Sequence, residues 1–358
     1  AVIHARGDSM YTADKGVPSA TDHAKSDPLC HVASLPSHDW PKDTQFEPFV
    51  PAHLSCRWGA VRFIPWTCKT KNGCAMPASD PQLLVSTDWL HRHLEAPDIR
   101  ILDASYYLPQ ENRSPKAEYQ LSHIPGARFF DIDEISDTRS SLPHMVPPVE
   151  KFVSRMRAMG IGDGHRIIVY DTAGLFSAAR VWWLFRLMGK TDVAVLDGGM
   201  PKWVAENRPV EDMPPIMRDR HFTAHRNAGL VRDVTQVASA AKLGTAQIVD
   251  ARSPGRFRGE EPEARPGLRP GRIPGSTNVF FKTLLNADGT MKAPQELKQV
   301  FDAAGVDLGR PVITTCGSGV TAAVVTLALE RVGHRNNALY DGSWAEWGAF
   351  QDSAVETG

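Results

Sequence analysis

The chain has 358 residues, which exceeds the usual size of one domain and favours two domains with additional sequence. Its hydrophobic fraction of 42% and charged fraction of 23% are ordinary for a globular protein, and no apolar run approaches the roughly 20 residues of a membrane span. A formal net charge of −1 gives no global electrostatic reason to expect nucleic acid or an anionic membrane as a partner.

Residues 1–80 contain little periodic apolar pattern and are expected to form an irregular extension. Four cysteines lie there without C-x-x-C spacing, so no metal site is expected: Cys30, Cys56, Cys68 and Cys74. The rest of the chain has a single cysteine, which fits a reducing compartment. With no secretory pattern and several acidic residues near the start, we expect a cytoplasmic location, with a mitochondrial one as the alternative.

An internal repeat begins near Leu83. Its four matched segments keep their order and are separated by offsets of 147, 149, 145 and 144 residues. Residues 101–105, 123–127, 166–171 and 195–199 match residues 248–253, 272–276, 311–316 and 339–343. A long repeat of this kind indicates two copies of one domain.

Strand and helix patterns alternate within each copy. Runs rich in Val and Ile predict strands over residues 167–170, 193–196 and 312–315, and apolar helical patterns predict helices over 177–188 and 321–332. The alternation predicts an α/β fold, with a mainly parallel sheet covered by helices on both faces of each domain. The expected boundaries are an extension over 1–80, a first domain over 82–207, a Pro-containing linker over 208–231 and a second domain over 232–352.

Cys316 follows a predicted strand and precedes a predicted helix, at the edge where open α/β sheets bind ligands. Gly317 and Gly319 allow the intervening backbone to curl, so that several N–H groups can point inward. Together with the helix N-terminus, this cradle would stabilise a thiolate or the outer sulfur of a persulfide. The alternative is a buried cysteine at a strand end with no reactive role.

The loop Cys-Gly-Ser-Gly-Val-Thr at 316–321, the paired copies, and Asp-Gly-Ser-Trp-Ala-Glu-Trp at 341–347 resemble the tandem rhodanese family. Within it they are similar to the 3-mercaptopyruvate sulfurtransferases, over roughly residues 82–350. The resemblance implies two rhodanese-like domains, a catalytic persulfide on Cys316, and no metal or organic cofactor. It implies that the first copy is not catalytic, because Asp171 replaces the cysteine there. It also makes the loop residues part of the substrate site: Gly317, Gly319, Val320 and Thr321.

The residues that follow Cys316 indicate which sulfur donor the site can use. Thiosulfate-using rhodaneses have basic side chains there, whereas this chain has Gly317 and Ser318, which favours 3-mercaptopyruvate, a thiol with one carboxylate. Phosphatases of this fold need an arginine at the end of the loop, where this chain has Thr321 and Ala322, so phosphate-ester hydrolysis is not expected.

Two arginines in residues 255–265 match the substrate-binding arginines of the family, Arg256 and Arg265. Guanidinium groups suit an α-keto carboxylate because they bind it bidentately and stay charged. The alternative is that these arginines pair with neighbouring glutamates on a solvated loop, the role we expect for Arg258. The candidate partners are Glu260, Glu261 and Glu263.

Ser318, His144 and Asp133 match a relay proposed for the family, which would polarise the substrate carbonyl or deliver a proton. The alternative is a hydrogen-bond network at a domain interface. Phe176 stands where some relatives have tyrosine and receives no polar role. Core packing is expected for Trp182, Trp183, Trp344 and Trp347, and capping of turn amides for Asp103 and Asp250.

The resulting hypothesis is transfer of sulfur from 3-mercaptopyruvate to thioredoxin, a small thiol or cyanide. Two other functions stay open at this point: a thiosulfate sulfurtransferase, and a non-enzymatic persulfide carrier or redox-sensing module.

Overall fold

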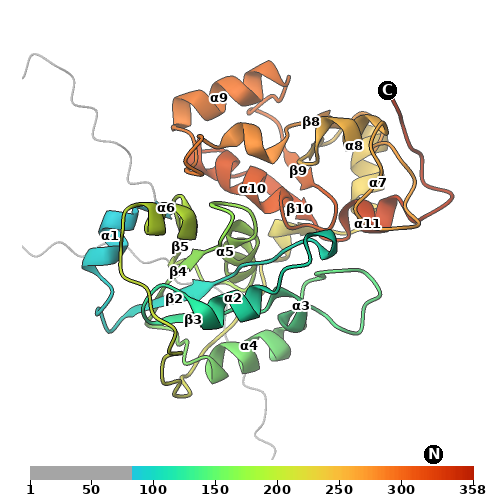
Figure 1. Cartoon of the computed structure of the whole chain (residues 1–358). Helices are drawn as coiled ribbons and strands as arrows, with labels where there is room; N and C mark the ends of the chain where they lie inside the picture. The colour runs from blue at the N-terminus through green and yellow to red at the C-terminus, as the bar shows by residue number, and fades with distance from the viewer. Residues whose placement is uncertain (1–82) are drawn as a thin grey trace, which may run out of the picture. The chain divides into compact units, whose positions relative to one another are not determined.

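The computed structural model describes residues 83–358, and the predicted extension over 1–80 therefore lies outside the described residues. Each half of the described part contains a five-stranded parallel sheet (Figure 1). The first has the order β1 (Leu84–Val85), β5 (Val193–Leu196), β4 (Arg166–Tyr170), β2 (Ile99–Asp103), β3 (Ala127–Phe129). The second has the order β6 (Val231–Arg232), β10 (Asn337–Tyr340), β9 (Val312–Thr315), β7 (Gln247–Asp250), β8 (Thr277–Asn278). The two orders are equivalent, which confirms the duplicated α/β fold.

Helices cover both faces of each sheet, as the strand pattern predicts. The first half contains α1 (Thr87–Arg92), α2 (Pro115–Leu121), α3 (Ile132–Ile135), α4 (Val149–Ala158), α5 (Ala178–Leu187) and α6 (Gly199–Ala205). The second contains α7 (Val234–Leu243), α8 (Pro254–Arg258), α9 (Pro294–Ala303), α10 (Ala322–Arg331) and α11 (Ser343–Trp347). Short 3-10 turns are η1 (Pro109–Glu111), η2 (Ala228–Leu230) and η3 (Phe281–Leu284). None of the helices within residues 83–358 combines the length and apolar character needed to cross a bilayer.

Strand β4 shows why each sheet has helices packed on both of its faces. Ile167 and Val169 belong to one buried cluster and Ile168 and Tyr170 to another, because successive side chains point to opposite faces. All four are fully buried, the pattern of a parallel strand between two layers of helices.

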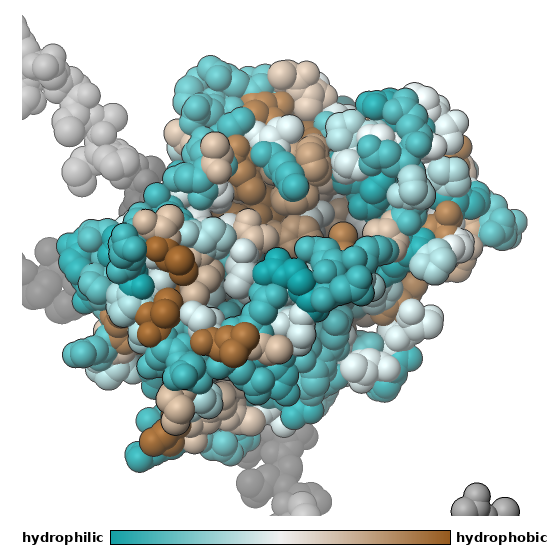
Figure 2. Space-filling view, in the orientation of Figure 1, coloured by the Kyte–Doolittle hydropathy of each residue, from teal (hydrophilic) through white to brown (hydrophobic). Residues whose placement is uncertain are grey.

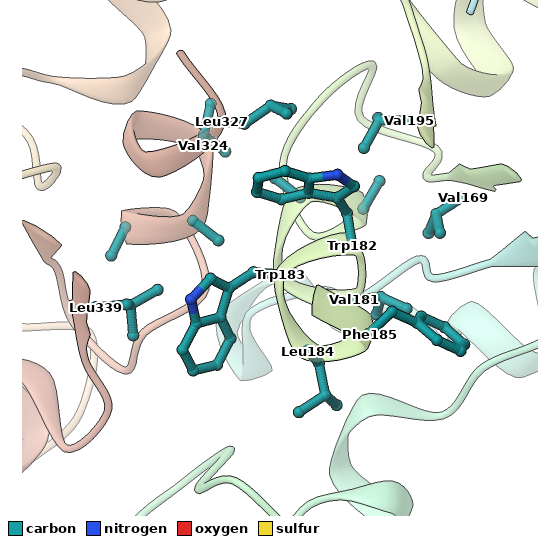
Figure 3. Close-up of a cluster of buried hydrophobic side chains, with 14 of the residues drawn as sticks. Val169, Val181, Trp182, Trp183, Leu184, Phe185, Val195, Val324, Leu327 and Leu339 are labelled. Atoms are coloured by element: carbon teal, nitrogen blue, oxygen red, sulfur yellow. The ribbon is translucent and has the colours of Figure 1, made fainter. Parts of the chain in front are cut away.

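The largest core cluster joins the two halves, with α5 of the first in contact with α10 of the second. Nine of the ten residues of α5 are buried, and all of its residues except Arg180 and Arg186 are apolar. Trp182 and Trp183 lie on α5 in this core, near residues of α10 such as Leu327 (Figure 3). The predicted core positions of Trp182, Trp183, Trp344 and Trp347 are confirmed, since none is more than 4% exposed.

The predicted helices over 177–188 and 321–332 correspond to α5 and α10, which begin one residue later and end one residue earlier. The predicted strands over 193–196 and 312–315 coincide with β5 and β9. Helix α10 therefore begins six residues after Cys316, and the intervening turn forms the floor of the candidate site.

Candidate active site

Cys316 lies at the carboxyl end of β9, the middle strand of the second sheet, and is 2% exposed. The start of α11 holds its backbone: the Trp344 amide donates to the Cys316 carbonyl at 2.9 Å and the Ala345 amide to the Gly317 carbonyl at 2.8 Å. The Cys316 amide donates to Ser343 Oγ at 3.3 Å. The thiol is therefore carried by a rigid loop behind which α10 begins.

Two glycines of this loop are explained by close contacts. Gly319 has φ +79°, and a Cβ there would lie 2.9 Å from Arg180 Nη1, so neither the backbone nor the space admits a side chain. A Cβ at Gly317 would lie 3.1 Å from Arg256 Nη2. The missing side chain at 317 thus makes room for a guanidinium directly beside the residue that carries the thiol.

The equivalent loop of the first copy has a carboxylate in place of the thiol. Asp171 is 1% exposed and accepts four backbone hydrogen bonds of 2.8–2.9 Å, from the amides of Ala173, Phe176, Ser177 and Ala178. By the repeat offset of 145 residues, their counterparts around Cys316 are the amides of Ser318, Thr321, Ala322 and Ala323. A loop of this shape is a cradle for an anion at the position of the first side chain.

The structure places Arg256 on α8, where Glu263 holds it through Nε at 3.1 Å and through Nη2. The Glu263 side chain is 2% exposed, and its second oxygen accepts from Arg252 Nη1 at 2.6 Å. Arg252 is itself fully buried and paired with Asp250 at 2.6 Å. The pairing of Arg256 with a glutamate is thus real, but the glutamate is buried and orients the guanidinium, rather than lying on a solvated loop.

The neighbouring predictions have distinct outcomes. Arg258 pairs with Glu260 on the exposed surface, as expected. Asp250 and Asp103 accept backbone amides two residues further along, also as expected, and Asp250 in addition neutralises Arg252. Sequence reasoning missed Arg252, whose only signal was its place directly after a buried strand.

Arg265 lines the same cavity as Cys316 and is half-buried. No carboxylate within residues 83–358 forms an ion pair with it. Burial raises the pKa of the Tyr106 hydroxyl, and the neighbouring Arg265 guanidinium opposes that rise. Arg265 therefore brings to the cavity a positive charge that has no direct ion pair among residues 83–358, and this charge also helps to lower the pKa of the Asp133 carboxyl.

The structure brings Ser318, His144 and Asp133 together, although they are far apart in the sequence. His144 Nδ1 lies 3.0 Å from Ser318 Oγ, and His144 Nε2 lies 3.0 Å from Asp133 Oδ1. The imidazole is 1% exposed, whereas the Asp133 side chain is 68% exposed. The hydrogen bond from His144 lowers the pKa of the Asp133 carboxyl, so the carboxylate accepts from Nε2–H. In neutral His144 this arrangement leaves Nδ1 free to accept the Ser318 hydroxyl proton.

Two charged residues near this relay were missed by sequence reasoning, Arg180 on α5 and Asp341 after β10. Their side chains are 3% and 8% exposed, and Arg180 Nη2 lies 2.6 Å from Asp341 Oδ1. The sequence contained a signal for Arg180, because a charged residue at a buried position of a mainly apolar helix requires a partner. It contained no indication of which partner that would be.

A cavity of about 910 Å³ opens above Cys316 and is lined by both halves of the described chain. Its floor includes the predicted loop residues Gly317, Ser318, Val320 and Thr321, while Gly319 packs behind the floor against Arg180. Its wall contains Phe176 packed on Phe281 with ring centroids 5.7 Å apart, so Phe176 has an apolar role. Figure 2 shows apolar residues gathered on the face where Figure 1 labels α9 and α10.

Among residues 83–358, no cluster of three or more His, Cys, Asp or Glu side chains could hold a metal ion.

Comparison with known proteins gives a consistent picture. The family model for the rhodanese-like domain matches residues 86–206 and 233–350. The chain is 45% identical over 273 residues to the 3-mercaptopyruvate sulfurtransferase of Escherichia coli K12, which covers 76% of this chain and 97% of the relative. It is 40% identical over 332 residues to the mitochondrial thiosulfate/3-mercaptopyruvate sulfurtransferase 1 of Arabidopsis thaliana, covering 86% of each chain. The crystal structure of SseA from Escherichia coli superposes with a TM-score of 0.69 at 43% identity, covering 74% of this chain and 100% of that one.

Proposed function

The chain belongs to the tandem rhodanese family, and from that premise we propose that it is a 3-mercaptopyruvate sulfurtransferase that carries sulfur as a persulfide on Cys316. The observation that carries the proposal is the position of Arg256, whose Nη2 would lie 3.1 Å from a Cβ at Gly317. A neutral loop next to a guanidinium suits a donor with a thiol at one end and a carboxylate at the other.

In the first half-reaction, the Cys316 thiolate attacks the thiol sulfur of 3-mercaptopyruvate. An S–S bond forms while the carbon–sulfur bond breaks, and its electron pair leaves with the carbon as the enolate of pyruvate. The enolate takes up the proton released by the donor thiol, which yields pyruvate and a Cys316 persulfide anion. Atoms and charge balance without an external oxidant.

Arg256 and Arg265 bind the α-keto carboxylate of the donor. Glu263 occupies Nε and Nη2 of Arg256, so Nη1 and the outer N–H of Nη2 remain to face the cavity. Arg265 adds a charge with no carboxylate partner of its own among the described residues. The two guanidinium groups can therefore bind the carboxylate of the donor and polarise its ketone oxygen.

The loop residues hold the sulfur. The four amides that surround Asp171 in the first copy have their sequence counterparts at Ser318, Thr321, Ala322 and Ala323, in and directly after the loop that contains Gly317, Gly319 and Val320. Charge-assisted hydrogen bonds to an anion are the stronger kind, so this cradle favours the thiolate before attack and the persulfide anion after it.

His144 and Ser318 are placed to move the proton. In neutral His144, Ser318 Oγ donates to Nδ1 at 3.0 Å while Asp133 accepts from Nε2, so the pair can take up the proton that the donor thiol releases. With the Ser318–His144 hydrogen bond reversed, the serine hydroxyl then passes that proton to the departing enolate. The first copy, although it lacks the cysteine, then contributes two of the three relay residues. The matched segments 86–206 and 233–350 support a non-catalytic domain over 82–207 and a catalytic domain over 232–352, joined by a linker over 208–231.

In the second half-reaction, a thiolate or cyanide attacks the outer sulfur, which leaves as a new persulfide or as thiocyanate and releases the Cys316 thiolate. We propose thioredoxin, a small thiol or cyanide as the acceptor, and the apolar wall of the cavity leaves room for a group larger than the donor. Location in the cytoplasm stays a prediction, since one relative is named as mitochondrial.

The test is incubation with 3-mercaptopyruvate and an acceptor, with release of pyruvate as the measurement. We expect catalytic release by the wild-type chain and none by Cys316→Ser, and intact mass should show one added sulfur atom on the wild type alone. An active Cys316→Ser variant would contradict the mechanism. A wild type that gains the sulfur without catalytic turnover would instead indicate a persulfide carrier.

A thiosulfate sulfurtransferase is the closest rival, because the Arabidopsis relative is named for both donors. The values of kcat/KM for the two donors, measured with the same acceptor, decide between them. A strong preference for thiosulfate would contradict the argument from Gly317 and Ser318.

A further inference from the structure

We propose that Arg180 and Asp341 form a clamp between the two domains that positions the His144–Ser318 pair for proton transfer. The proposal rests on the function proposed above and assigns positioning roles to two buried residues that do not contact the cavity. Arg180 comes from α5 of the first domain and Asp341 from the end of β10 in the second. Their ion pair at 2.6 Å therefore spans the domain interface.

The clamp holds the backbone on both sides of the relay. Arg180 Nη2 donates to the His144 carbonyl at 2.6 Å, and the second oxygen of Asp341 accepts from the Val146 amide at 2.8 Å. On the other side, Arg180 Nη1 donates to the Gly319 carbonyl at 3.4 Å, one residue beyond Ser318. The one ion pair thus fixes the segment that carries the imidazole and the loop that carries the hydroxyl.

His144 needs such support because its backbone is in the left-handed region, with φ +60°. A residue with a Cβ is rare there and keeps that conformation only where its surroundings enforce it. The bonds from the clamp to residues 144 and 146 act at this point of the backbone. Without them, the imidazole would keep its contacts with Tyr106 and Asp133 but lose its fixed distance to Ser318 Oγ.

The chain contains a matched control on the same helix. Arg186 of α5 pairs with Glu330 of α10 at 3.1 Å, and the Glu330 side chain is 4% exposed. Both arginines also lie over tryptophans, Arg180 at 4.5 Å from the ring centroid of Trp183 and Arg186 at 5.3 Å from that of Trp182. Arg186 therefore makes a second, partly exposed ion pair across the same interface, with a glutamate that also pairs with Arg335, and this ion pair does not reach the relay.

The experiment compares Arg180→Gln with Arg186→Gln in the wild-type and His144→Asn backgrounds. Asparagine at 144 tolerates the left-handed backbone and cannot carry a proton as imidazole does. We expect Arg180→Gln to lower kcat for pyruvate release by about tenfold, less than the roughly 10²- to 10⁴-fold that a general acid or base supplies, because His144 is displaced and not removed, with KM for the donor changing by less than about threefold. Arg186→Gln should keep kcat within about twofold, because Arg186 pairs with Glu330 and does not line the cavity.

The double variant separates positioning from general damage. If Arg180 acts through His144, Arg180→Gln should lower kcat by less than about twofold in the His144→Asn background, because the pathway it supports is already absent. Arg180→Lys, which keeps the charge opposite Asp341, should recover part of kcat. Equal losses in both backgrounds, or an equal loss in Arg186→Gln, would overturn the proposal.

Two further measurements keep the test decisive. If Arg180→Gln does not fold, Asp341→Asn takes its place, since it keeps one oxygen for Arg180 and loses the acceptor for the Val146 amide. NMR of the histidine rings, with the His144 signal identified by its loss in His144→Asn, should show that signal shifted in Arg180→Gln and unshifted in Arg186→Gln. This readout needs no turnover, so an unshifted His144 signal overturns the clamp, whereas a wild type without pyruvate release overturns the proposed function alone.

Discussion

Replacement of Gly317 by arginine tests the link between the loop and the choice of donor. Gly317 is a loop position close to Arg256, with only 3.1 Å between a built Cβ and the guanidinium nitrogen. A second guanidinium there would bring another positive charge to the sulfur site, and it would also repel Arg256. Thiosulfate is a dianion and gains from the added charge, whereas 3-mercaptopyruvate has one carboxylate and depends on Arg256 for its orientation.

The size of the effect follows from Coulomb's law. Two unit charges about 6 Å apart interact by ~3 kcal/mol at an effective dielectric constant of ~20 and by ~0.7 kcal/mol in bulk water. The cavity is open to solvent, so we expect between these limits about 1–2 kcal/mol of extra stabilisation for the dianion. This corresponds to a shift of roughly 5- to 30-fold in the ratio of kcat/KM for thiosulfate to that for 3-mercaptopyruvate.

The assay is steady-state kinetics with both donors and cyanide as the common acceptor, at low and high ionic strength. Gly317→Gln is the control, because it adds a side chain of similar length without charge and reports the steric part alone. The shift should diminish in high salt, where exposed charges are screened. A folded Gly317→Arg variant whose donor ratio equals that of Gly317→Gln would refute the reasoning that loop charge selects the donor.

Three further predictions concern carboxylates that are buried or partly buried near the two loops. Glu263→Gln should lower the free energy of unfolding by about 3 kcal/mol in urea denaturation, because Arg252 and Arg256 lose a shared carboxylate that is 2% exposed, and an unchanged midpoint would contradict this. Asp171→Ala should cost about 3–5 kcal/mol in the same measurement, since four backbone amides lose their acceptor, with Asp171→Asn as the milder control. Burial raises the pKa of Glu346 above 4.5, so its ionisation opposes folding at neutral pH and does not below pH 4.5. Glu346→Gln should therefore raise the melting temperature at pH 7 and leave it unchanged in acid, and a gain that is independent of pH would contradict that assignment.

Local sequence patterns predicted many of the strands and helices, because apolar runs and glycine turns specify these elements within a short stretch of chain. Strand β9 and the helix that begins at Ala322 follow from an apolar run, a glycine turn and a second apolar run. The duplication was visible because both copies keep their order of elements, and the two sheets indeed share one strand order. Cys316 at the carboxyl end of a central strand is a consequence of the same pattern.

Contacts across the domain interface could not be predicted in this way. Arg180 and Asp341 are 161 residues apart, and the sequence around either residue does not predict that the two form an ion pair. The role of Glu263 was equally hidden, because three glutamates stand near Arg256 and only the structure shows which one is buried against it. The left-handed backbone of His144 could not be predicted either, since histidine adopts that region more often than most residues but in only a minority of cases.

The first copy clarifies the chemistry of the second. A duplicated loop that lost its thiol could have been filled by an apolar residue, yet Asp171 places a carboxylate where four amides converge. Amides that point at one spot are costly to bury without an acceptor, so the loop requires a negative or strongly accepting group at its centre. In the second copy, the group at that place is Cys316, and a neutral thiol accepts hydrogen bonds only weakly. We therefore expect the duplicated loop to favour the anionic persulfide that the proposed reaction forms on Cys316, because an anion accepts hydrogen bonds from backbone amides more strongly than a neutral thiol does.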